Sequence, residues 1–138
     1  APLPDARRYV TRRRVQHYEL DSERHVNNAV YLNWVEQAFW DACAAAGVPL
    51  PGEPIGDGRR LVVRRHELAY RQPAVAGDEI EIASRLHRIA PGRHTWLHEV
   101  RRATDDALLV RALAVHDCLD DHRRPAPFPE AYRRALAG

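Results

Sequence analysis

The chain has 138 residues, of which 45% are hydrophobic and 29% charged, and its formal net charge is only +2. This length and balance predict one soluble globular domain over residues 1–138, with no second domain required. No apolar run is long enough to cross a bilayer and no secretory signal pattern is present, so we expect a cytoplasmic protein without a membrane partner.

The arginines and cysteines of the chain argue against a nucleic-acid-binding protein and against a fold held together by disulfides or zinc. All 21 basic residues are arginine, and the clusters at residues 7–8 and 12–14 are interpreted as solvated parts of an arm and a strand. No nucleic-acid partner is expected, because no recognisable binding module accompanies these clusters. Cys43 and Cys118 lie far apart without a C-x-x-C partner, so we expect buried thiols rather than a disulfide framework or a zinc ribbon.

The first third of the chain predicts an arm, a strand and a helix. Residues 1–8 contain two prolines and predict a flexible arm, and residues 9–20 are rich in β-forming residues and predict a strand. From Asn28, apolar residues recur at steps of three and four, which predicts a helix that has one buried side and ends at Gly47. This apolar stripe comprises Tyr31, Trp34, Val35, Ala38, Phe39, Ala42, Ala45 and Ala46. Together with Trp40, it makes the helix so apolar that we expect a sheet to surround it.

The rest of the chain predicts strands joined by short turns. Residues 48–59 hold three prolines and three glycines and predict a loop. Four strands are then expected, at about 60–72, after the Ala76-Gly77-Asp78 turn, at about 93–104 and at about 107–119, before a short helix at EAYRRAL.

This order of elements predicts an α+β protein. A strand, a long apolar helix and four antiparallel strands suit the hot-dog fold, in which a curved antiparallel β-sheet wraps around one long central α-helix. The edges of such a sheet are open to pairing with a second copy, so a homodimer or homotetramer is expected.

The segment DSERHVNNAVY, from Asp21 to Tyr31, places an acid at the end of the first strand and just before the helix start. The first N–H groups of a helix lack partners and lie at the positive end of its dipole, so they can stabilise an oxyanion. An acid beside them can attack a carbonyl carbon or activate a water molecule. Hydrolysis of a thioester suits this arrangement, because its thiolate leaves with little acid assistance.

The string YELDSERHVNNAVYLNWVE resembles the active-site segment of the hot-dog thioesterases. It is similar to the plant acyl-carrier-protein thioesterases, which have a D-x-N-x-H-V-N-N-x-x-Y pattern. It resembles still more the β-ketoacyl-carrier-protein thioesterases, which share Y-E-L-D and V-N-N-A-V-Y. The 4-hydroxybenzoyl-CoA thioesterases have the same spacing of ten residues as Asp21 and Tyr31 here. The resemblance covers about residues 14–128 and implies a thioesterase for acyl-carrier-protein or acyl-CoA substrates, with β-keto or polyketide chains as candidates.

The resemblance also implies roles for individual residues. Asp21 takes the place of the catalytic carboxylate, as a nucleophile or a general base, and His25 that of the histidine of the plant enzymes. Asn28 stands where a backbone N–H polarises the thioester carbonyl. The candidate substrate-binding residues are Asn27, Tyr31 and Glu23, with Tyr31 expected along the acyl channel.

Two departures from the family pattern leave the supporting acid–base group open. Glu23 stands where the plant pattern has Asn, and Ala69 stands where many relatives have a Glu before the aromatic of the second strand. Glu67 lies two residues earlier on the same strand face and is the candidate catalytic substitute. Glu36 lies one residue short of the plant enzymes' helix Glu and ranks lower.

Two other functions stay open from the sequence. A non-catalytic module that binds acyl thioesters would explain the missing Glu at Ala69. A hot-dog hydratase or dehydratase would carry D-x-N-P-x-H, but here His25 follows Asp21 by four residues and no proline intervenes. No serine hydrolase is expected without a G-x-S-x-G turn. His94 and His98 share a strand face but lack further ligands, so neither a metal nor another cofactor is expected.

Overall fold

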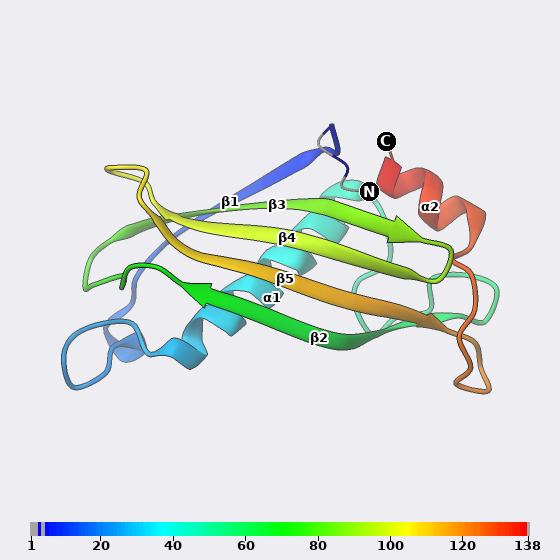
Figure 1. The fold of residues 1–138 in the computed structure, drawn as a ribbon, viewed down its shortest axis with the longest axis horizontal. Coiled ribbons are helices and arrows are strands. Elements are labelled where there is room, and N and C mark those ends of the chain that lie inside the picture. The colour runs from blue at the N-terminus through cyan, green and yellow to red at the C-terminus, as the bar shows by residue number, and fades with distance from the viewer. Residues whose placement is uncertain (1–2, 4, 138) are drawn as a thin grey trace.

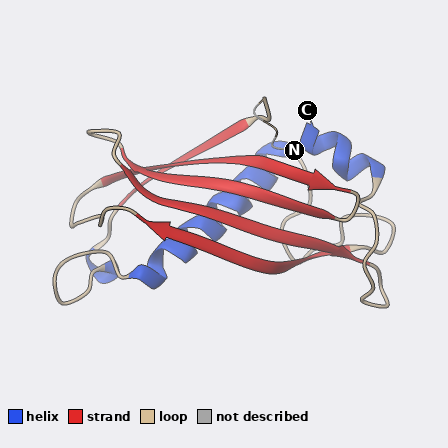
Figure 2. Cartoon of the chain, in the orientation of Figure 1, coloured by secondary structure: helices blue, strands red, loops and turns tan. Residues whose placement is uncertain are grey.

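The strand-forming segments pair into one antiparallel sheet, and the long apolar segment forms a helix against it. A computed structural model, which describes residue 3 and residues 5–137, shows this arrangement (Figure 1, Figure 2). The elements are β1 (Arg8–Arg14), the short 3-10 helix η1 (His17–Glu19), α1 (Asn28–Ala46), β2 (Arg60–Tyr70), β3 (Glu79–Ala90), β4 (Arg93–Arg102), β5 (Leu108–Leu119) and α2 (Glu130–Ala137). The predicted α+β architecture is therefore observed.

The sheet has the strand order β1-β3-β4-β5-β2, and every neighbouring pair is antiparallel. The register shifts between Leu86 and Arg88 on β3 and between Val63 and Arg65 on β2. Such bulges bend their strands and increase the twist, which helps a sheet to curve. α1 crosses one face of the sheet diagonally and packs against β1 and β3 (Figure 1). The two edges of the sheet are β1 and β2.

The helix α1 starts and stops where the sequence predicts. The side chain of Asn27 caps it by accepting the N–H of Ala29 at 2.9 Å, and Gly47 ends it with a left-handed φ of 76°. The predicted stripe is buried except at its last turn, where Ala45 is exposed. Trp40 is also 41% exposed, so the sheet does not surround it as expected.

The first strand is shorter than the predicted span 9–20. Its sheet contacts end after Arg14, with the N–H of Val15 donating to the carbonyl of Asp78 at 3.0 Å. The carboxylate of Glu19 then accepts the N–H of Gln16 at 2.8 Å, and the chain turns into η1. Asp21 therefore follows a helical turn and not the end of a strand.

The core divides along α1 into two groups of buried side chains. The group around the start of the helix contains Tyr31, Trp34 and Val35, and the group around its end contains Phe39, Trp96 and Phe128. α2 covers the second group through Tyr132 and Leu136. The start of α1 thus lies at the end of the molecule opposite α2 (Figure 1).

Of the predicted arm 1–8, residues 1, 2 and 4 lie outside the described residues, as does residue 138. The N–H of Leu3 donates to the carbonyl of His87 at 2.8 Å, and Arg8 already belongs to β1. Neither helix in the described part of the chain is long and apolar enough to span a membrane.

Candidate active site

Asp21 lies in a tight loop that its own backbone closes. The N–H of Asp21 donates to the carbonyl of His25 at 2.8 Å, and the N–H of Arg24 donates to the carbonyl of Asp21 at 3.0 Å. The Asp21 Oδ1 atom accepts the N–H groups of Glu23 at 2.9 Å and of His25 at 3.2 Å. The side chain is exposed, and its Oδ2 atom has no hydrogen-bond partner among the described residues. The loop therefore fixes the carboxylate and leaves one oxygen available.

A second loop of the protein has the same geometry. The N–H of Asp120 donates to the carbonyl of Arg124 at 2.9 Å, and its Oδ1 atom accepts the N–H groups of His122 and Arg124, both at 2.9 Å. Arg123 has a φ of 61° there, and Arg24 has a φ of 64° in the Asp21 loop. The turn alone therefore marks no active site, and what distinguishes Asp21 is its surroundings.

The start of α1 follows the Asp21 loop directly. The N–H of Asn27 is held by the carbonyl of Glu19 at 2.9 Å, and the N–H of Val30 donates to the carbonyl of Asn27 at 2.9 Å. Asn28 is exposed, and within the described residues nothing accepts its backbone N–H. An unpaired N–H at the positive end of a 19-residue helix is suited to bind a carbonyl oxygen.

Two hollows open beside these residues. One, of about 450 Å³, is lined by Asp21 together with Val15, His17, Leu20, Arg24, Ala76 and Gly77. The other, of about 210 Å³, is lined by Asn28 together with Tyr31, Tyr70, Arg71, Gln72 and Pro73. The segment 72–77 connects the two hollows, since residues 72–73 line the second and residues 76–77 line the first. Ala74 holds this segment by accepting the N–H of Val26 at 2.9 Å. The hollow beside Asp21 and the hollow beside Asn28 are therefore both bounded by this short segment.

Tyr31 also holds the segment 72–77 in place, through a hydrogen bond. Its hydroxyl accepts the N–H of Ala74 at 2.9 Å, and its ring is almost fully buried beside Tyr70. Burial raises the pKa of the Tyr31 phenol, which therefore stays protonated at neutral pH. Tyr31 still borders the Asn28 hollow, so a contact with substrate stays a prediction.

The remaining predicted residues have different surroundings. Glu23 is exposed and contributes its backbone N–H to Asp21. His25 is half-buried, and its backbone both closes the Asp21 loop and bridges to Val75. Glu67 lies on the face of β2 opposite Leu68, which packs into the core, and its nearest charged partner is Arg65 at 3.8 Å. No hydrogen bond or ion pair among the described residues joins Glu67 to Asp21.

Glu19 supports the site and was not among the predicted residues. Its buried carboxylate accepts from Trp34 Nε1 at 2.7 Å and from the guanidinium of Arg13 at 2.8 Å. The Y-E-L-D string contains Glu19, but no local pattern distinguishes it from an exposed strand residue. The N–H of Gln16 is a local partner, but the packing of β1 against α1 supplies Trp34 and Arg13.

Comparison with known proteins decides the family. A model of the thioesterase-like superfamily matches residues 15–136, which include the Asp21 loop, α1 and every strand of the sheet except β1. The chain belongs to the thioesterase-like superfamily. The hot-dog fold, the family and the thioester-hydrolase class predicted from the sequence are therefore confirmed.

Relatives of this thioesterase come from bacteria and plants. It is 32% identical over 113 residues to the long-chain acyl-CoA thioesterase FadM of Escherichia coli, with 80% of this chain and 82% of FadM covered. It is 24% identical over 120 residues to the chloroplastic acyl-acyl carrier protein thioesterase ATL3 of Arabidopsis thaliana, with 87% of this chain covered. The chain spans 63% of the length of that plant protein. The crystal structure of Slr0204, a 1,4-dihydroxy-2-naphthoyl-CoA thioesterase from Synechocystis, shares the fold with a TM-score of 0.84 and 21% identity over 94% of this chain and 95% of that one.

The cysteines of this thioesterase are poor candidates for the nucleophile. Both Cys43 and Cys118 are buried, as expected from the sequence. Burial raises the pKa of Cys43 to about 12 and also raises the pKa of Cys118. Because the thiolate is the reactive form, neither side chain is activated at neutral pH.

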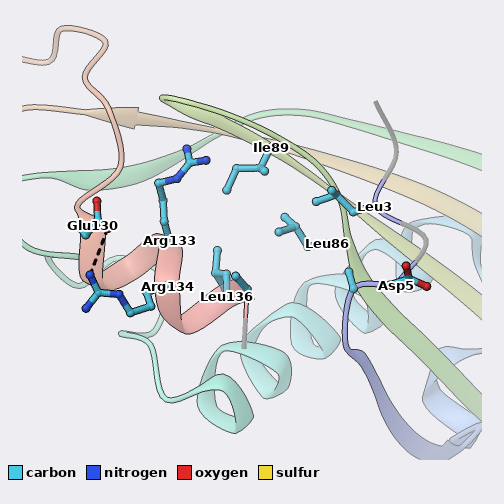
Figure 3. A pocket seen from close by; sticks show the side chains of 10 residues that line it. Leu3, Asp5, Leu86, Ile89, Glu130, Arg133, Arg134 and Leu136 are labelled. Atoms are coloured by element: carbon cyan, nitrogen blue, oxygen red, sulfur yellow. Dashed lines mark hydrogen bonds and ion pairs between the residues drawn. The ribbon is translucent and has the colours of Figure 1, made fainter.

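Another cavity of the thioesterase, of about 490 Å³, lies far from Asp21. Leu3, Leu86, Ile89 and Leu136 form its apolar walls, and Arg133, Arg134 and Glu130 of α2 lie at its rim (Figure 3). Arg134 pairs with Glu130 at 3.1 Å, as the dashed line in Figure 3 marks. This cavity adjoins α2, at the opposite end of the molecule from the start of α1 (Figure 1), so it is not part of the candidate active site.

Proposed function

We propose that this protein hydrolyses acyl thioesters of acyl-carrier protein or coenzyme A, with Asp21 and the backbone N–H of Asn28 as the catalytic pair. The observation that carries the proposal is the fixed carboxylate with one available oxygen directly before an unpaired helix N–H. Local hydrogen bonds hold both groups in place before a substrate arrives. Such preorganisation is where enzymes gain most of their electrostatic catalysis.

The reaction that we assign to Asp21 and the N–H of Asn28 has few steps. The thioester carbonyl oxygen accepts the N–H of Asn28, which stabilises the negative charge that develops on it. The free oxygen of Asp21 either attacks the carbonyl carbon, giving an anhydride that water then cleaves, or removes a proton from the water that attacks. In both routes the C–S bond breaks, and the products are a free carboxylic acid and a thiol. Single turnover in oxygen-18 water separates the routes, because only the anhydride route transfers an oxygen of Asp21 to the product.

The substrate class is supported by the two relatives. FadM is a long-chain acyl-CoA thioesterase and ATL3 is an acyl-acyl carrier protein thioesterase. We therefore assign an acyl group on a pantetheine thiol, with β-keto and polyketide chains among the candidates. A cytoplasmic location stays a prediction from the sequence.

A homodimer formed through β2 is part of the proposal. β2 is an edge strand of 11 residues, and its side chains Val63 and Tyr70 are 56% and 48% exposed. Trp40 of α1 is 41% exposed as well. A long edge strand with exposed apolar side chains is a template for pairing with another strand. Sedimentation should therefore show at least a dimer, and a charged residue at Val63 should weaken it.

The deciding experiment compares two aspartates in matched loops. Asn at either position can still accept both loop N–H groups, so Asp21→Asn and Asp120→Asn remove a charge without removing the turn. With a panel of acyl-CoA and acyl-carrier-protein substrates, we expect Asp21→Asn to lower kcat about 100- to 10,000-fold. Asp120→Asn should retain wild-type activity.

Two outcomes would contradict the proposal. Equal activity of Asp21→Asn and wild type would remove Asp21 from the chemistry. Stoichiometric binding of acyl-CoA that is recovered intact from wild type would favour the non-catalytic binding module. Hydration of an enoyl thioester, seen as a loss of its absorbance, would favour the hydratase.

A further inference from the structure

Three histidines are buried on the inner face of the sheet, away from the Asp21 loop. His94 and His98 lie on β4 and His116 lies on β5, and none is more than 4% exposed. Burial lowers the pKa of His94 and His98 to about 3 and that of His116 to about 4, so all three are neutral at physiological pH. Histidine is rarely buried so completely without a purpose for its polar atoms.

Each of the three keeps one ring nitrogen without a hydrogen-bond partner among the described residues, and only His98 and His116 border a cavity beside α1. His94 Nε2 lies 2.9 Å from the hydroxyl of Tyr132, which ties β4 to α2. His98 Nδ1 lies 2.6 Å from Ser84 Oγ. His94 Nδ1, His98 Nε2 and His116 Nδ1 are shielded from solvent and find no hydrogen-bond partner among the described residues. Neutral imidazole nitrogens of this kind can donate to or accept from an uncharged oxygen.

Both side chains border a narrow cavity between α1 and β2. Its volume is about 50 Å³, and its walls include Val35 and Phe39 of α1, Leu61 and His66 of β2, and His98 and His116. The described residues contain no cluster of His, Cys, Asp or Glu arranged to hold a metal ion. On the helix side, the cavity is lined by the apolar side chains of Val35, Phe39 and Trp40 and by the carboxylate-bearing Glu36, and on the sheet side it offers imidazole edges.

The position of the cavity relates it to the proposed active site. The Asn28 hollow is likewise bounded by α1 and β2, through Tyr31 and Tyr70. Val35 and Phe39 lie seven and eleven residues after Asn28, which places the cavity about 10–17 Å further along the helix. A medium-length acyl chain that starts at Asn28 and follows α1 reaches this distance with its far end.

We propose that this cavity binds the far end of the acyl group, and that His98 and His116 select a chain or ring that carries an uncharged oxygen there, a hydroxyl or a carbonyl. This inference rests on the proposed function, because Asn28 sets where the thioester lies. A plain methyl end would leave the two imidazole nitrogens unpaired. A carboxylate would lose its hydration without gaining a positive charge. Sites that hydrogen-bond a substrate group discriminate strongly against analogues that lack it.

Binding measurements on the Asp21→Asn protein test this selection while the thioesters stay intact. The probes are decanoyl-CoA, ω-hydroxydecanoyl-CoA, β-hydroxydecanoyl-CoA and the ω-carboxyl analogue, which share the same coenzyme. We expect the ω-hydroxy compound to bind at least about tenfold more tightly than decanoyl-CoA. The β-hydroxyl lies too near the thioester to reach the cavity, so that compound and the ω-carboxyl analogue should show no gain.

Variants assign the preference to the two histidines. His98→Leu and His116→Leu should each bring the ratio of the two dissociation constants toward one. His94→Gln is the matched control, since it changes a buried histidine on the same face that does not border the cavity, and it should keep the ratio. Retention of the preference in both Leu variants would overturn the assignment.

The test remains decisive if those variants fail to fold. Equal affinity of the parent protein for ω-hydroxydecanoyl-CoA and decanoyl-CoA would itself overturn the inference and leave the cavity to ordered water. Failure of the proposed function is a separate result, because it would appear as wild-type protein that cleaves none of the thioesters, whatever the binding ratio.

Discussion

The indole N–H of Trp34 donates a hydrogen bond of 2.7 Å to the carboxylate of Glu19. Arg13 contacts both partners, since its guanidinium pairs with Glu19 at 2.8 Å and lies 4.9 Å from the centre of the Trp34 ring. The backbone carbonyl of Glu19 holds the N–H of Asn27 at 2.9 Å. One buried acid thus joins β1 and α1 to the residue that caps the helix, and it sets where the Asp21 loop begins.

Replacement of Glu19 should therefore weaken the whole protein. In Glu19→Ala, Trp34 Nε1 and the N–H of Gln16 lose their acceptor and Arg13 loses its counter-charge. Removing one partner of a buried ion pair typically costs about 3–5 kcal/mol. We expect a decrease of that size in the free energy of unfolding, measured with urea.

Two controls separate charge from burial at this position. Glu19→Gln keeps an oxygen for Trp34 and should lose less than Glu19→Ala. Glu81→Ala removes the partner of Arg12, whose side chain is 75% exposed, and should cost at most about 1 kcal/mol. A loss in Glu19→Ala no larger than in Glu81→Ala would contradict the role given to Glu19.

The elements that depend on local sequence could be predicted, and those set by distant contacts could not. The start of α1 follows from Asn27 and its end from Gly47, because both act on their immediate neighbours. The early end of β1 depends on Val15 reaching Asp78, and on the buried surroundings of Glu19, which sequence periodicity does not reveal.

The candidate site shows the same division. Only the resemblance makes Asp21 the candidate carboxylate, because the loop geometry of Asp120 is the same and local structure does not distinguish the two. Tyr31 was expected along the acyl channel, yet its hydroxyl holds the backbone of Ala74. The free nitrogens of His98 and His116 could not be predicted, since their isolation depends on how three strands and α1 pack together.

Removal of the Tyr31 hydroxyl should loosen residues 72–77. In Tyr31→Phe, the N–H of Ala74 loses its acceptor in a fully buried position. An unpaired buried donor costs about 1–3 kcal/mol, so the unfolding free energy should fall by that amount. Hydrogen exchange at Ala74 should accelerate as well. Tyr70→Phe is the control, because Tyr70 is 48% exposed and its hydroxyl donates to the carbonyl of Asn28 at 3.2 Å. Unchanged hydrogen exchange at Ala74 in both variants would contradict the role given to Tyr31.

Loss of the helix cap should affect stability and catalysis together. Asn27→Ala leaves the N–H of Ala29 without its 2.9 Å partner, which typically costs about 1 kcal/mol. The same change frees the first turn of α1 and displaces the N–H of Asn28, so kcat should fall more than the fraction of folded protein does. Asn27→Ser restores a capping oxygen and should recover most of both. A stability loss with unchanged kcat would argue against Asn28 as the carbonyl donor.

Because of the buried histidines, the free energy of unfolding should decrease as the pH is lowered. Their pKa values are lowered by burial from the ordinary 6.5 to about 3 for His94 and His98 and about 4 for His116. Between pH 6.5 and about 4 the unfolded chain therefore binds protons that the folded chain does not. The free energy of unfolding should be constant with respect to these groups above that window. Within it, each group should remove up to about 1.4 kcal/mol per pH unit as the solution is acidified.

Urea unfolding in a series of buffers from neutral to acidic pH measures this slope, and His94→Gln tests its origin. The variant keeps a side chain able to bond to the hydroxyl of Tyr132 but removes one of the three titrating groups. Below pH 6.5, the free energy of unfolding of the variant should fall less steeply with pH than that of wild type, by about one proton per molecule. Above that pH, the free energies of the two proteins should change with pH in the same way. Identical slopes would mean that His94 is protonated in the folded state or that acid opens the sheet locally before the chain unfolds. Either result would conflict with an imidazole held neutral between β4, α1 and α2.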